Sequence, residues 1–134
     1  SNTVQAIVIS GGAVQFNQSF VISDTTEFNK IAIKYKVNDF ALWIDGVEVA
    51  TDTSGDTFSS GELTTLTFDN ATGTNLFYGR CKSVAVFKEA LSDTELACLT
   101  STNNREIFLN YYYRMQYVGA NIEALSCAEQ TFNV

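Results

Sequence analysis

Short segments in which apolar and polar residues alternate recur along this chain, bounded by Gly, Asn, Asp or Ser. The clearest is residues 30–37, where every second side chain from Ile31 to Val37 is apolar or aromatic and those between are largely basic. A period of two places successive side chains on opposite faces of a β-strand. The sequence therefore predicts a mainly antiparallel, all-β fold.

Two pairs of such segments predict β-hairpins. Residues 4–9 and 13–22 flank Ser10-Gly11-Gly12, and residues 40–44 and 47–51 flank Asp45-Gly46. An Asp-Gly pair readily adopts the positive φ angles of a two-residue type I′ turn. We expect both hairpins to form.

The later part of the chain carries further predicted elements. Residues 63–68 and 76–87 alternate and are expected to be strands, the second with a bulge or a close backbone approach at Gly79. Ser92 and Glu95 have the spacing of a helix capping box, which predicts a short helix over about 93–101. The aromatic segment 103–134 is expected to pack onto a β-sandwich formed by these strands or onto another subunit.

Size and composition narrow the classes of function. The 134 residues fit one domain, 1–134, and a Ser-Asn start without Met also fits a fragment of a larger protein. The net charge of −7 disfavours nucleic acid and anionic membrane surfaces as partners, and no apolar run is long enough to span a bilayer. The chain has no His and its three Cys are not closely paired, so a catalytic triad, a zinc centre or a redox motif is not expected.

Three motifs follow one another in the order and spacing of a known family. They are the hairpin Leu42–Val47, the Phe-Tyr-Gly-Arg strand from Phe77 to Phe87, and the helix start Lys88–Leu96. Together they resemble the second half of a laminin-G-like or pentraxin-like domain of the concanavalin A-like lectin/glucanase superfamily. The resemblance covers about half of the chain, residues 29–100, and implies an antiparallel jelly-roll sandwich.

The same resemblance implies a function. The chain is expected to be a non-catalytic glycan-binding or adhesion module, part of a viral tail or fibre or of a cell-surface assembly, located outside the cell or on the virion surface. Its partners would be a glycan or cell-surface polysaccharide, together with self-association or neighbouring domains. The Glu-x-Asp-x-x-Glu strand of the glucanases does not occur, so we do not expect an enzyme. The alternative is a purely structural or oligomerisation domain without a ligand site.

Several side chains are candidates for ligand binding. An exposed Trp43 ring would stack on a sugar, whereas a Trp on an alternating strand also suits the core. The candidate ligand-binding residues are Trp43, Asp69, Asn70, Asn75 and Tyr78.

Oxygen-rich loops also suggest a metal. Asp52, Asp56 and Asp69 supply the hard ligands that laminin-G-like domains use for calcium. The same residue types are ordinary turn formers, so calcium and simple turns stay open as alternatives. Lys30, Lys34 and Lys36 form a basic stripe that is expected either to be a solvated strand face or to contact an anionic glycan.

Overall fold

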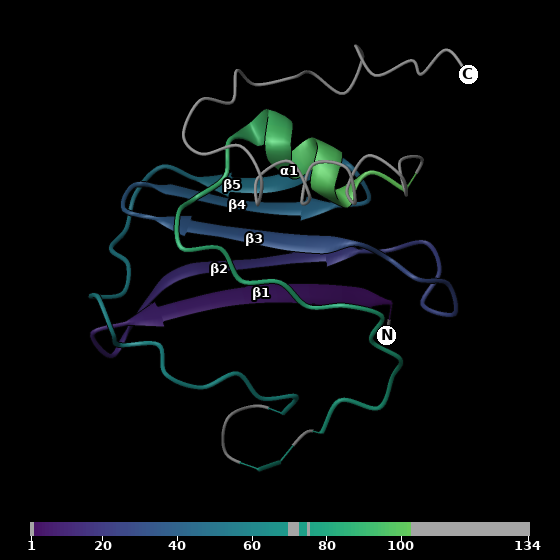
Figure 1. Cartoon of the computed structure of the whole chain (residues 1–134), viewed down its shortest axis with the longest axis horizontal. Coiled ribbons are helices and arrows are strands. Elements are labelled where there is room, and N and C mark those ends of the chain that lie inside the picture. Colours follow the sequence, from purple (N-terminus) through teal and green to yellow (C-terminus); the bar gives the residue numbers. More distant parts are fainter. Residues whose placement is uncertain (1, 70–72, 75, 103–134) are drawn as a thin grey trace, which may run out of the picture. The chain divides into compact units, whose positions relative to one another are not determined.

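The computed structural model describes residues 2–69, 73–74 and 76–102. The described residues fall into two compact units, one of residues 2–57 with 90–102 and one within residues 58–89. In the described part of the chain, the strands and the helix all belong to the first unit (Figure 1). The predicted aromatic tail, 103–134, lies outside the described residues, and a single domain over 1–134 stays a prediction.

The first predicted hairpin is confirmed. Strands β1 (Thr3–Ser10) and β2 (Ala13–Val21) pair antiparallel, with Val8 opposite Phe16 and a register shift between Val8 and Ile9. Gly11 and Gly12 form the turn with φ angles of 59° and 77°. These left-handed values favour glycine, because the Cβ of most other residues crowds the backbone there.

The second predicted hairpin is also confirmed, within a three-stranded sheet. Strands β3 (Ile31–Lys36), β4 (Asp39–Ile44) and β5 (Val47–Asp52) are antiparallel, with β4 in the centre. Asp45 and Gly46 have φ angles of 50° and 87°, as a type I′ turn requires. The Asp45 carboxylate accepts a hydrogen bond from the Lys30 backbone N–H at 2.8 Å, which joins the turn to the start of β3.

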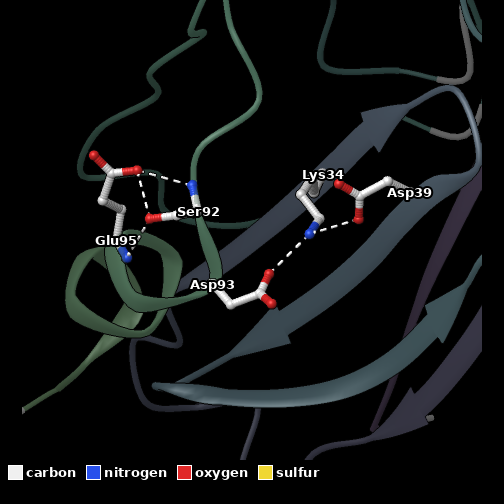
Figure 2. A network of polar contacts seen from close by, with 5 residues as sticks. All are labelled: Lys34, Asp39, Ser92, Asp93 and Glu95. Carbon is white, nitrogen blue, oxygen red and sulfur yellow. Dashed lines mark hydrogen bonds and ion pairs between the residues drawn. The ribbon is translucent and has the colours of Figure 1, made fainter. Parts of the chain in front are cut away.

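The predicted helix forms as α1 (Asp93–Thr100). The Glu95 backbone N–H donates to Ser92 Oγ at 3.3 Å, and the Ser92 backbone N–H donates to Glu95 Oε2 at 2.8 Å (Figure 2). The capping box read from the sequence is therefore present, and it satisfies two amide groups that the first helical turn leaves without partners. This short helix does not approach the length and apolarity needed to cross a membrane, and no other helix is found among the described residues.

The first unit is built in layers around the three-stranded sheet. On one face, Ala41 and Trp43 of β4 form a buried cluster with Leu96 of α1. Residues alternate along a strand, so Phe40 points to the opposite face, where its ring stacks on Phe16 of β2 with centroids 5.8 Å apart. The α1 helix thus covers one face and the β1-β2 hairpin packs on the other. The structure is mostly β, in two small antiparallel sheets with one short helix, which confirms the all-β prediction at that level.

Two predicted strands are wrong. Residues 63–68 and the described residues of 76–87 form no strand, although a backbone hydrogen bond of 2.9 Å joins the Phe77 N–H to the Phe68 carbonyl. Side chains that the alternation marks as buried remain exposed, with Leu66 at 64% and Val86 at 71%. A period of two shows which side chains share a face, but a strand also needs a neighbouring backbone, which a local pattern does not specify.

The alternation in β3 suggests that its apolar face is buried and its basic face is exposed, but the structure shows the opposite for Ile33 and Lys34. Lys34 is only 8% exposed, whereas Ile33 is 41% exposed. Lys34 lies on the face that α1 covers, and Lys30 Nζ donates to the Ser101 carbonyl at the end of that helix. The expectation of a solvated basic stripe is wrong for Lys34 and holds for Lys36, which is exposed.

Candidate ligand-binding site

The structure places Trp43 in the core. The side chain is 7% exposed and packs in the cluster with Ala41 and Leu96, because β4 is the central strand and α1 covers this face. The indole N–H is buried without a hydrogen-bond partner among the described residues. Trp43 therefore offers no exposed ring for a sugar, and of the two roles considered from the sequence the core role is the one observed.

One residue of the basic stripe, Lys34, is likewise engaged inside the molecule. Lys34 Nζ lies between Asp39 Oδ1 at 2.7 Å and Asp93 Oδ1 at 2.8 Å, which ties β3, the start of β4 and the start of α1 together (Figure 2). Burial lowers the pKa of Lys34, but the hydrogen bonds and charges of the two carboxylates outweigh burial and raise that pKa above its ordinary 10.5. Lys34 forms ion pairs that connect β3, β4 and α1, so its ammonium group is not free to bind an anionic ligand.

The predicted calcium ligands serve as turn residues. Asp52 Oδ1 accepts from the Ser54 N–H at 2.9 Å and from Ser54 Oγ at 2.8 Å, and these bonds lower the pKa of Asp52. Asp56 Oδ1 accepts from the Thr57 N–H at 3.1 Å.

The three predicted calcium ligands are divided between the two units. Asp52 and Asp56 belong to the first unit, and Asp69 belongs to the second. Across residues 2–69, 73–74 and 76–102, no three His, Cys, Asp or Glu side chains lie close enough together to hold a metal ion. The turn-forming alternative explains the positions of Asp52 and Asp56.

Two of the five predicted ligand residues, Asp69 and Tyr78, lie in the second unit, each next in the sequence to a phenylalanine. We call Phe68, Asp69, Phe77 and Tyr78 the aromatic cluster. Tyr78 is 91% exposed, Phe77 57% and Phe68 55%. The other two predicted residues, Asn70 and Asn75, lie outside the described residues.

A backbone hydrogen bond and the glycine at position 79 determine how the two phenylalanine rings lie. The Phe77 N–H donates to the Phe68 carbonyl at 2.9 Å, and the two rings lie with centroids 6.1 Å apart and planes tilted by 39°. A Cβ added at Gly79 would lie 2.5 Å from Phe77 Cζ, so the Phe77 ring occupies space that only glycine leaves open. The close approach expected at Gly79 is therefore made by a side chain. Only Tyr78 projects almost wholly into solvent.

The aromatic cluster combines apolar rings with polar groups. Exposed aromatic rings present an apolar face, and the Tyr78 hydroxyl adds a donor and an acceptor at its rim. Asp69 Oδ1 accepts from Thr67 Oγ1 at 2.8 Å, which positions a carboxylate beside Phe68. The aromatic cluster therefore presents two tilted apolar rings and an exposed tyrosine, with a carboxylate next to Phe68 in the sequence.

Sequence reasoning missed Phe68 and Phe77, because both fell in segments interpreted as strands. The available signal was their position, since Phe68 directly precedes the polar stretch 69–75 and Phe77 follows it after one residue. Binding residues often lie on or beside such loops.

No protein-family model matches the sequence, and neither does any curated protein. The structure is similar to residues 221–444 of an S-layer domain-containing protein from Clostridium thermocellum ATCC 27405, with a TM-score of 0.45 and 15% sequence identity. The match covers 74% of this chain and 52% of that one, so the chain spans about half of the length of its neighbour.

Proposed function

We propose that this chain is a non-catalytic glycan-binding module of an extracellular or virion-surface assembly, and that the aromatic cluster is its binding surface. The observation that carries the proposal is the 91% exposure of the Tyr78 side chain beside the half-exposed Phe68 and Phe77. Leaving a large aromatic side chain in solvent costs free energy. Exposed apolar groups that lie together and are surrounded by polar groups are typical of interaction sites.

The polar rim favours a carbohydrate over a purely apolar ligand. Asp69 follows Phe68 directly, and the stretch from Asp69 to Asn75 is rich in Asn, Thr and Asp. Carboxylate, amide and hydroxyl groups bind sugar hydroxyls, while an aromatic face packs on the apolar face of the sugar ring. This combination explains why the aromatic residues and the polar loop occur together.

The fold proposal is that the chain belongs to the concanavalin A-like jelly-roll sandwiches. The hairpin at residues 42–47 and the capping box at residues 92–95 support it, because both form where the resemblance requires them. The proposed absence of catalysis is supported by the lack of the Glu-x-Asp-x-x-Glu strand, since glycoside hydrolysis needs two carboxylates at a fixed separation.

A comparison of two variants tests the binding surface. Tyr78→Ala is expected to weaken glycan binding at least about tenfold, because it removes the most exposed ring of the site. Val86→Ala is the control, since Val86 is also in the second unit and 71% exposed but lies outside the aromatic cluster. Binding to immobilised glycans would be measured for the wild type and both variants. Equal binding by wild type and Tyr78→Ala would contradict the proposal.

The second candidate is a structural or oligomerisation domain, and a separate observation favours it. Apolar side chains on the strands themselves remain exposed, including Ile9 at 55% and Val21 at 70%. A module that assembles with its own copies would cover them.

A further inference from the structure

Arg80 is an exposed cation of the second unit. Its side chain makes no hydrogen bond or ion pair with any residue that the structure describes. By contrast, Lys34 of the first unit is paired with two carboxylates, and Lys82 takes part in an interaction of its own. A guanidinium group stays charged at every pH at which proteins are folded. Arg80 therefore presents a permanent positive charge that these residues do not pair.

The covalent chain holds Arg80 beside the aromatic cluster. Consecutive Cα atoms are about 3.8 Å apart, so the Cα atoms of Tyr78 and Arg80 are at most about 7.6 Å apart. At the residue between them, an added Cβ on Gly79 would lie 2.5 Å from Phe77 Cζ, so the Phe77 ring reaches the residue directly before Arg80. A ligand that packs on these two rings is within reach of the guanidinium on its long aliphatic stem.

The charge of the second unit is compatible with an anionic ligand. Residues 58–89 contain three acidic and three basic residues, so this segment is neutral, whereas the whole chain has a net charge of −7. The excess of negative charge therefore belongs to the rest of the chain. At physiological ionic strength, exposed charges more than about 8 Å apart are largely screened, so the neighbouring residues matter most to a bound anion.

The residue types at the aromatic cluster restrict the kind of anion. A guanidinium group presents its N–H donors as a fork that matches the two oxygens of a carboxylate. A sugar with a carboxylate substituent offers an apolar ring face to the aromatic side chains and an anion to Arg80. The carboxylate of Asp69 and the net charge of −7 disfavour a ligand with many negative charges, such as a densely sulfated chain.

We propose that the glycan bound by the aromatic cluster contains a carboxylated sugar, a uronic or sialic acid, and that Arg80 binds its carboxylate. This inference rests on the proposed function and names the class of ligand, which the rings alone do not determine. The rings of Phe77 and Tyr78 supply affinity for a sugar ring of any charge. Arg80 supplies the preference for the acid.

A pair of ligands that differ in charge tests the proposal on the unchanged protein. Oligosaccharides that contain glucuronic, galacturonic or sialic acid would be immobilised both as free acids and as their neutral methyl esters. The wild type is expected to bind the free acid of at least one of them at least about tenfold more tightly than the ester. The ester keeps the sugar ring but lacks the negative charge that Arg80 pairs.

Three variants assign this preference to Arg80. Arg80→Gln is expected to bind acid and ester equally, because it removes the positive charge. Arg80→Lys is expected to keep only part of the preference, since an ammonium group cannot form two parallel bonds to a carboxylate. Lys88→Gln is the matched control and is expected to keep all of it, because it removes the same charge from an exposed side chain of the second unit outside the aromatic cluster. Circular dichroism reports the folding of each variant.

The outcomes separate this inference from the proposed function. Equal binding of acid and ester by the wild type would overturn the carboxylate assignment and leave a glycan-binding module. An acid preference that persists in Arg80→Gln would overturn the role of Arg80, and tighter binding to a densely sulfated glycan than to every carboxylated one would overturn the class of ligand. Tyr78→Ala is expected to weaken binding of acid and ester alike. No binding to acidic, esterified or neutral glycans would overturn both proposals.

Discussion

Lys34 shows how a single side chain joins three elements. Its Nζ contacts Asp39 and Asp93, whose side chains are 41% and 63% exposed, while Lys34 itself is 8% exposed. Because solvent screens the two carboxylates, Lys34→Met is expected to lower the free energy of unfolding by about 1 kcal/mol. Lys34→Ala also loses the packing of the aliphatic stem and is expected to cost about 1 to 2 kcal/mol more. Urea unfolding of both variants measures the difference, and equal stabilities for Met and Ala would contradict a packing role for the stem.

The same residue predicts a stability change at alkaline pH. The pKa of Lys34 is raised above 10.5 in the folded chain, so its stabilising contribution is fully present below pH 10.5 and is lost as pH rises through the folded-state pKa. The difference in thermal midpoint between wild type and Lys34→Met should therefore shrink between about pH 10 and 12. A difference that stays constant over that range would contradict the ion pairs as its source.

At the scale of elements, the turn between β4 and β5 is tied to the end of α1. The Gly46 N–H donates to Thr100 Oγ1 at 3.1 Å, and a Cβ at Gly46 would lie 3.3 Å from the Ser101 Cα. Gly46→Ala is expected to lower the free energy of unfolding by about 2 to 4 kcal/mol, because alanine is strained at a positive φ and its Cβ would crowd the end of α1.

Gly12→Ala is the matched control for the turn. Gly12 also has a positive φ, 77°, but nothing lies within 4 Å of an added Cβ. It is expected to cost about 1 kcal/mol. The difference between the two variants in the free energy of unfolding, measured with urea, gives the contribution of the contact with α1. Equal losses of stability would show that crowding against α1 contributes nothing.

The start of α1 gives a second test at this scale. Ser92→Ala is expected to lower the free energy of unfolding by about 1 kcal/mol, because the Glu95 amide loses its acceptor. Ser92 and Glu95 bond to each other reciprocally, so the double variant Ser92→Ala with Glu95→Ala should cost less than the sum of the two single variants. A double-variant cycle by urea unfolding measures the coupling. Strict additivity would contradict a working capping box.

Across the whole molecule, the sequence predicted what is determined locally. The Asp45-Gly46 turn and the Ser92–Glu95 cap depend on neighbours within a few residues, and both form. The burial of Lys34 depends on Asp93, which is 59 residues away along the chain. Strand formation at 63–68 depends on a partner backbone, which no alternation pattern reveals.

The candidate site was predicted only in part, for the same reason. Asp69 and Tyr78 were recognised from their residue types, but the contact between the neighbouring Phe68 and Phe77 depends on a backbone hydrogen bond between residues nine positions apart. Trp43 was considered a ligand residue because of its type alone, and the α1 helix, which lies some fifty residues later, buries it. Long-range packing decides which of several suitable side chains reach the surface.

The central proposal is that this is a glycan-binding module. A glycan-array screen of the wild-type chain, with calcium and with a chelator, tests it most directly. We predict binding to one class of glycan that persists in the chelator, since ring stacking and hydrogen bonds to the aromatic cluster need no metal ion. Binding that requires calcium would contradict a site built on the aromatic cluster alone. No binding to any glycan would contradict the proposed function and favour a structural module.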